Sequence, residues 1–129
     1  MGTRSHTYIV EGETPIGALY RQCDGYVDGH GKELARFLSG HTIVNGFGSK
    51  SDPVFNGIGD LGVRLFTHLK GNADEVGNFY LIAPTVPDSE EYGYYVSIRD
   101  NAVHVVVTAN GERIFAGTPE ELLTFEEGE

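Results

Sequence analysis

Apolar residues recur at every second position in two neighbouring stretches, Tyr92–Arg99 and Ala102–Ala109. This period predicts β-strands, because successive side chains of a strand point to opposite faces of a sheet. Shorter β-rich runs predict further extended segments, over His6–Glu11, Ile16–Arg21, His41–Phe47, Asn78–Ala83 and Arg113–Ala116.

Turn residues separate these predicted strands. Asp100-Asn101 and Asn110-Gly111 each stand between two strand patterns and predict tight hairpin turns. Gly12–Pro15 predicts a turn between the first two strands, and the polar, proline-containing run Gly48–Asn56 predicts a loop.

A period of 3.6 residues marks the helices, and it is clearest over Gly57–Lys70. Asn56 is the predicted N-cap of this helix. We expect the glycines in its first turns to allow close packing on another backbone. A shorter helix is predicted over His30–Ser39, with Asp28 or a nearby backbone group as its cap and Gly40 as its end.

The run Thr118-Pro119-Glu120-Glu121 has the pattern of a capping box with proline at the first helical position. It predicts a short C-terminal helix that extends to Phe125. Together these elements predict an α+β domain that covers residues 1–129. We expect an antiparallel sheet of about five to six strands, with two main helices and the short C-terminal helix packed on one face.

Net charge, apolar runs and the cysteine count favour some classes of function over others. Nine Lys and Arg stand against 19 Asp and Glu, which gives a net charge of −10. A negative chain is a poor match for phosphate backbones, so we expect no direct nucleic-acid binding; a basic protein partner would suit this charge better. No apolar run has transmembrane length, and the single cysteine suits a reducing compartment, so a cytoplasmic location without membrane contact is expected.

One glycine-rich stretch concentrates the candidate chemistry, between the second predicted strand and the first predicted helix. Its candidate ligand-binding residues are Arg21, Asp24, Tyr26, Asp28, Gly29, His30 and Gly31. The first interpretation is structural: the aspartates form turn and cap hydrogen bonds to nearby backbone amides. On this interpretation the stretch is a joint between a hairpin and a helix.

Two functional interpretations of this stretch remain open beside the structural one. The N–H groups at Gly29–Gly31 would favour a small anion such as a phosphate or nucleotide, with Arg21 or Lys32 as the charge partner. Alternatively, Asp24, Asp28 and His30 together could bind a divalent metal. No other cofactor is expected.

Cys23 gives a further alternative. It could form a thiolate–imidazole pair with His30 or His41, but a small buried hydrophobic role is the more common one for a lone cysteine.

Several motifs resemble a family of small uncharacterised proteins of bacteriophages and bacterial mobile elements. The residues that carry the resemblance are Met1–Ser5, Leu19–Gln22, Asp24–Tyr26, Gly29–Gly31 and Leu34–Leu38, with a looser match at Val44–Gly46 and Asn56–Lys70. The chain departs from the pattern at Cys23 and Val27. The resemblance implies a phage-associated setting in the host cytoplasm and no established activity.

Two functional hypotheses follow. The first is a non-enzymatic accessory protein that binds a host protein or a small anionic, nucleotide-like ligand and counters host defence. The second is a small metal- or His-dependent hydrolase that uses Asp24, Asp28 and His30. An exposed strand edge would also allow two copies to pair as a homodimer.

Overall fold

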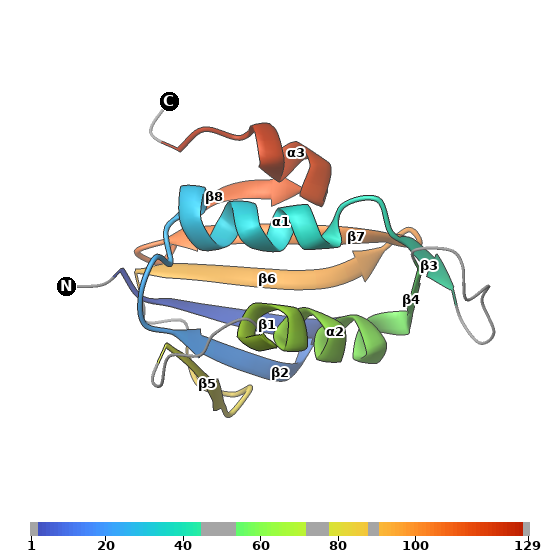
Figure 1. Ribbon diagram of the computed structural model, residues 1–129, viewed down its shortest axis with the longest axis horizontal. Helices are drawn as coiled ribbons and strands as arrows, with labels where there is room; N and C mark the ends of the chain where they lie inside the picture. The colour runs from blue at the N-terminus through green and yellow to red at the C-terminus, as the bar shows by residue number, and fades with distance from the viewer. Residues whose placement is uncertain (1–2, 45–53, 72–77, 88–90, 128–129) are drawn as a thin grey trace.

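The computed structural model describes residues 3–44, 54–71, 78–87 and 91–127. Six strands form one sheet, and three helices lie against one of its faces (Figure 1). The α+β class and the position of the helices agree with the prediction. No helix within the described ranges is long and apolar enough to cross a membrane.

The strands follow the predicted segments closely. In chain order they are β1 (Ser5–Glu11), β2 (Thr14–Arg21), β5 (Phe79–Ile82), β6 (Tyr92–Arg99), β7 (Ala102–Ala109) and β8 (Glu112–Gly117). Their spatial order is β5-β2-β1-β6-β7-β8, so the first strand of the chain lies inside the sheet. The hairpin turns at Asp100-Asn101 and Asn110-Gly111 are confirmed, and all four residues have positive φ.

One strand pair corrects the prediction of an antiparallel sheet. β1 and β6 run parallel, with Ser5 opposite Tyr92 and Ile9 opposite Val96. All other neighbours in the sheet are antiparallel. The sheet is therefore mixed and mostly antiparallel. No turn joins β1 to β6, so no local sequence signal could mark their direction.

The first helix begins earlier than its sequence pattern indicates. A single π-helical turn, η1 (Val27–Gly31), leads directly into α1 (Lys32–Leu38). The helical region therefore begins at Val27, three residues ahead of the predicted start at His30. Gly40, with φ of 79°, follows the helix as predicted.

The second helix, α2 (Gly57–Gly71), begins at the predicted residue and ends one residue later than predicted. The predicted loop over Gly48–Asn56 is wrong for its last residues, because β4 (Val54–Asn56) pairs in parallel with β3 (Thr42–Val44). The Asn56 N–H donates to Asp60 Oδ2 at 2.8 Å. Residues 45–53 lie outside the described part, and with them the rest of the predicted segment His41–Phe47 and most of the loop.

Only one glycine of α2 packs closely. A Cβ on Gly62 would lie 3.2 Å from the Cγ atoms of Ile9 on β1, whereas nothing lies within 4 Å of that position on Gly57 or Gly59. The close approach therefore occurs at Gly62, and the atoms that it meets belong to a side chain. The expectation that these glycines pack on another backbone is wrong.

The capping box of α3 (Pro119–Thr124) is confirmed. Glu121 N donates to Thr118 Oγ1, and Thr118 N donates to Glu121 Oε1. Leu122 enters the core from this helix. Between sheet and helices the core consists mainly of aliphatic residues, with Ile9, Leu34, Leu38, Phe55, Leu61, Leu65, Tyr94, Val96, Val105, Val107 and Leu122 nearly or fully buried.

Candidate functional site

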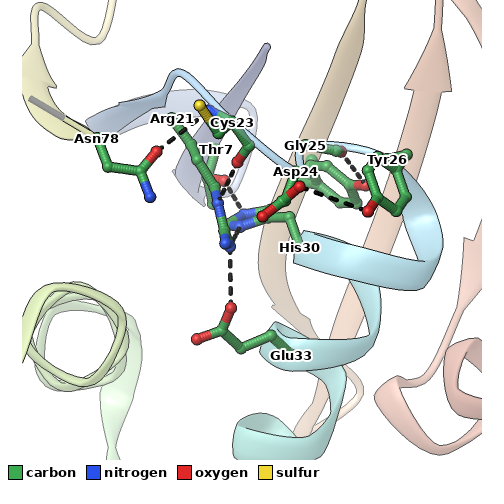
Figure 2. Close-up of polar contacts among 10 residues, drawn as sticks. Thr7, Arg21, Cys23, Asp24, Gly25, Tyr26, His30, Glu33 and Asn78 are labelled. Atoms are coloured by element: carbon green, nitrogen blue, oxygen red, sulfur yellow. Dashed lines mark hydrogen bonds and ion pairs between the residues drawn. The ribbon is translucent and has the colours of Figure 1, made fainter. Parts of the chain in front are cut away.

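The glycine-rich stretch contains a buried histidine, His30, and of the other candidate residues Arg21 contacts its ring (Figure 2). His30 is fully buried, and its two ring nitrogens contact different strands: Nε2 lies 2.7 Å from Thr7 Oγ1 on β1, and Nδ1 lies 3.1 Å from Arg21 Nη1 on β2. Its ring also packs edge-on against Tyr94 of β6, with 4.8 Å between the ring centroids. His30 thus connects η1 to three strands of the sheet.

Arg21 extends this network to the first helix. Its Nη1 donates to Glu33 Oε1 at 2.9 Å, and its Nε donates to the Cys23 carbonyl at 2.6 Å. The guanidinium lies over the ring of Phe79, 4.9 Å from the centroid. Since the whole residue is 9% exposed, these contacts leave little of its charge for a ligand in solution.

The hydrogen bonds fix the protonation state of His30. An arginine has only donors, so His30 Nδ1 must accept from Arg21 and Nε2 must carry the proton that goes to Thr7. Burial, and after it the neighbouring charge of Arg21, lowers the pKa of His30 to about 3. His30 is therefore a neutral, fully bonded side chain at neutral pH.

The backbone N–H groups that would bind an anion already donate hydrogen bonds within the loop. Asp24, at a φ of 63°, presents its carbonyl to the His30 N–H at 2.8 Å. Gly29 N and Gly31 N both donate to the Tyr26 carbonyl, at 3.1 and 3.4 Å. These N–H groups already have partners inside the loop, so an anion would have to displace them.

Two positions of this loop require glycine, because backbone atoms of other residues lie where a Cβ would be. A Cβ on Gly29 would lie 2.5 Å from the Asp24 carbonyl oxygen, and one on Gly25 would lie 2.9 Å from the backbone carbon of Arg4. Tyr94 Oη completes the arrangement by donating to the Gly25 carbonyl at 2.7 Å. The interpretation of this stretch as a glycine-shaped joint therefore has a specific geometric basis.

The aspartates do not take the predicted capping roles. No side chain caps η1 or α1; the Asp24 carboxylate accepts from Tyr26 Oη at 3.4 Å, and Asp28 is exposed on η1. It is the backbone carbonyl of Asp24 that closes the loop. The sequence analysis correctly placed Asp24 in the turn, but it assigned the hydrogen bond to the side chain instead of the backbone carbonyl.

The metal interpretation finds no assembled ligand set. His30 has both nitrogens bonded to protein groups, while Asp24 and Asp28 lie on the exposed side of the loop. In the described ranges, no group of three or more His, Cys, Asp or Glu side chains could hold a metal ion.

Cys23 is exposed, which corrects the expectation of a small buried hydrophobic residue. Its backbone N–H donates to the Asn78 side chain at 3.1 Å and its carbonyl accepts from Arg21. The suggested partner His30 is bonded elsewhere. The other, His41, stacks on Phe55 with 4.1 Å between the centroids. The loop therefore holds Cys23 by its backbone and directs it outward.

Two of the candidate residues line a different feature, a cleft of about 890 Å³ between η1 and the C-terminal segment. Tyr26 and Asp28 form one side of it, and Leu123–Glu127 form the other. Lys32 also lines the cleft, and its Nζ donates to the carbonyls of Leu122, Leu123 and Phe125 at 2.8, 2.9 and 2.5 Å. This lysine binds the end of α3 and is not available as the predicted partner of an anion.

Sequence reasoning missed the most exposed large apolar side chain among the described residues, on the edge strand β5. Leu81 is 78% exposed and Tyr80 47% exposed. Beside them lies a groove of about 520 Å³, lined by Leu19, Phe66, Thr67, Lys70, Gly71, Phe79 and Leu81. The run Phe-Tyr-Leu-Ile without a charge or proline was a usable signal, because edge strands are commonly protected by such residues.

Comparisons with known proteins add no assignment: no family model, curated protein or solved structure matches the chain. The resemblance to small phage proteins therefore stays a prediction.

Proposed function

We propose that this protein is a non-enzymatic accessory protein that binds another protein by adding an extended segment of that partner to strand β5. The observation that carries the proposal is the edge strand β5, which pairs only with β2 in the described part of the chain and lies beside an apolar groove. The resemblance to small phage proteins suggests a host protein as the partner, and interference with host defence as the setting.

The hydrogen-bond pattern of β5 supports this mode of binding. Gln22 N donates to the Asn78 carbonyl at 2.9 Å, which makes this position a hydrogen-bonded pair of the β2–β5 ladder. Hydrogen-bonded and non-hydrogen-bonded pairs alternate along an antiparallel ladder. The backbone N–H and C=O groups of Tyr80 and Ile82 therefore also point toward β2. The N–H and C=O groups of Phe79 and Leu81 then point to the open side, where a partner strand can use them.

The groove gives such a partner a place for a side chain. It lies between α2 and β5, and Lys70 is the one charged residue in its described lining. Backbone hydrogen bonds supply affinity in this mode, and pockets for alternate side chains supply specificity. An apolar residue of the incoming strand would be buried against Phe66 and Leu81.

The hydrolase alternative lacks comparable support. Its general base would be His30, which is fully buried, neutral and bonded through both nitrogens. A general base must reach the proton of a substrate or water. We therefore place the function on the surface of β5 rather than in the buried network.

Hydrogen exchange on the full chain tests the proposal. The partner is first captured from a lysate of the natural host cells with the wild-type protein. We expect the amides of Phe79 and Leu81 to exchange rapidly in the free protein and to be protected in the complex. Protection elsewhere, with β5 unchanged, would contradict the proposal.

A matched pair of variants completes the test. Leu81→Arg places a charge and a long side chain on the proposed interface and should abolish capture. Val63→Arg, at another exposed apolar residue on α2 outside the groove, should leave capture intact. Protection that appears with protein concentration alone would identify a homodimer through β5 instead of a foreign partner.

A further inference from the structure

Four aromatic rings gather where α1, α2 and the β3–β4 pair meet. His68 of α2 stacks on Phe37 of α1 at 4.4 Å between centroids, and His41 stacks on Phe55 of β4 at 4.1 Å. Phe37 links the two stacks, because it lies 5.6 Å from His41 and 5.9 Å from Phe55. We call these four residues the ring cluster.

A cavity of about 350 Å³ opens beside the ring cluster. It is lined by Phe37, His41, Val63, Arg64, Thr67 and His68. Small-molecule sites in proteins have volumes of roughly 300–1,000 Å³, so this cavity can hold a ligand the size of a mononucleotide. It shares no lining residue with the groove beside β5 except Thr67.

The polar lining residues suit an anion. Arg64, Thr67 and His68 are spaced i, i+3, i+4 and therefore share one face of α2. Arg64 Nε donates to Asp60 Oδ1 at 3.1 Å, which positions the guanidinium and leaves its other N–H groups for a ligand. Among the described lining residues, none is a carboxylate.

The charge distribution supports the same ligand. The whole chain carries −10, but α1 and α2 together hold four basic and two acidic residues. Both acidic residues are paired with arginines, Glu33 with Arg21 and Asp60 with Arg64. The basic residues of these two helices therefore outnumber their acidic residues, which favours the approach of an anion.

We infer that the cavity is a binding site for a small phosphorylated ligand with a planar ring, of the size and chemistry of a nucleoside monophosphate. Arg64, Thr67 and His68 hold the phosphate, with Arg64 as the bidentate donor. Phe37 and Val63 contact the planar ring. This site lies apart from strand β5, although Thr67 also lines the groove beside that strand.

Titration of the ¹⁵N-labelled full chain with adenosine monophosphate tests the inference. We expect shifts confined to amides around the cavity, in α2 and near Phe37 and His41. Inorganic phosphate and adenosine serve as the two partial probes. Each should bind at least roughly ten-fold more weakly than the nucleotide, because each uses only part of the site.

The variants are chosen at exposed positions, so that folding is retained. Arg64→Gln should weaken binding of adenosine monophosphate about ten-fold or more, whereas Arg36→Gln, at an exposed arginine of α1 outside the cavity, should not change it. Leu81→Arg should also leave it unchanged, which separates this inference from the function proposed for β5.

Three outcomes would overturn the inference. The first is the absence of shifts with any of the three probes at 10 mM (a concentration on the order of a weak ligand's dissociation constant). The second is equal weakening by Arg64→Gln and Arg36→Gln, which would indicate general charge attraction. The third is equal affinity for phosphate and nucleotide, which would leave an anion site without contact to a ring.

Discussion

Single residues of the glycine-rich stretch determine how closely η1 can approach the backbone of Asp24. A side chain at position 29 would meet the Asp24 carbonyl oxygen at 2.5 Å, and backbone cannot move aside as a flexible side chain can. Gly59 has no atom within 4 Å of the same position and lies in a regular helix. Glycine is therefore essential at one position and exchangeable at the other.

We expect Gly29→Ala to lower the free energy of unfolding by more than about 1 kcal/mol, because the loop must open to admit the methyl group. Gly59→Ala should instead raise it by about 0.5–1 kcal/mol, since alanine loses less entropy in a helix. Urea denaturation of both variants measures the difference. Equal effects would show that the close contact at Gly29 does not constrain the fold.

The buried His30 makes stability depend on pH in a defined direction. Its pKa falls from 6.5 to about 3 on folding, so the unfolded chain binds the additional proton between these values. Stability is therefore lost as the pH falls below 6.5, by about 1.4 kcal/mol per pH unit once the unfolded histidine is protonated. Below pH 3 this loss stops growing.

His30→Gln isolates this contribution. Glutamine can still accept from Arg21 and donate to Thr7, but it does not titrate. Between pH 7 and pH 5 we expect the wild type to lose about 2 kcal/mol more than the variant in urea denaturation. The same loss in both proteins would mean that other groups cause the acid sensitivity.

At the scale of elements, α3 is held by the residue that precedes it and by carbonyls at and just beyond its end. The Thr118 hydroxyl caps its start, and Lys32 binds the carbonyls at its end. We expect Thr118→Ala to cost about 1 kcal/mol in the free energy of unfolding, because the Glu121 N–H loses its acceptor. Thr124→Ala, which removes a hydroxyl from the exposed end of the same helix, is the control and should cost less. Thermal unfolding at neutral pH distinguishes the two.

Local sequence patterns predicted the elements well, because each depends on neighbouring residues. The alternation over Tyr92–Arg99 and the capping box at Thr118 needed no knowledge of distant parts of the chain. The parallel direction of β1 and β6 could not be predicted, since it joins segments without a connecting turn. The π turn was missed because Gly29 and Gly31 are as typical of a loop as of a tightly packed helical turn.

The candidate site was predicted less well for a related reason. The pattern identified Arg21, Asp24 and His30 as an unusual group, and these residues do contribute to one connected loop. Whether a polar side chain faces solvent or another side chain depends on tertiary packing. Both ring nitrogens of His30 are bonded to Thr7 and Arg21. The spacing of these residues along the sequence does not reveal that they are close in space.

At the scale of the whole molecule, the strand order predicts a hierarchy of protection. β2, β1, β6 and β7 have neighbours on both sides, whereas β5 and β8 are edges. We expect the slowest amide exchange in β1 and β6 and the fastest among strand residues at Phe79 and Leu81. Native-state hydrogen exchange measures this order. A β5 that exchanges as slowly as β1 would show that its edge is covered in solution.

The parallel pairing of β1 with β6 also has a consequence for synthesis in the cell. β1 leaves the ribosome first, and its hairpin partner β2 follows at once, but β6 is made more than 80 residues later. At about 5–20 residues per second, one side of β1 waits on the order of ten seconds for its permanent neighbour. During that interval the nascent chain presents two strand edges, β1 and β2, so crowding on polysomes or chaperone capture would act on the N-terminal hairpin before any other part of the fold.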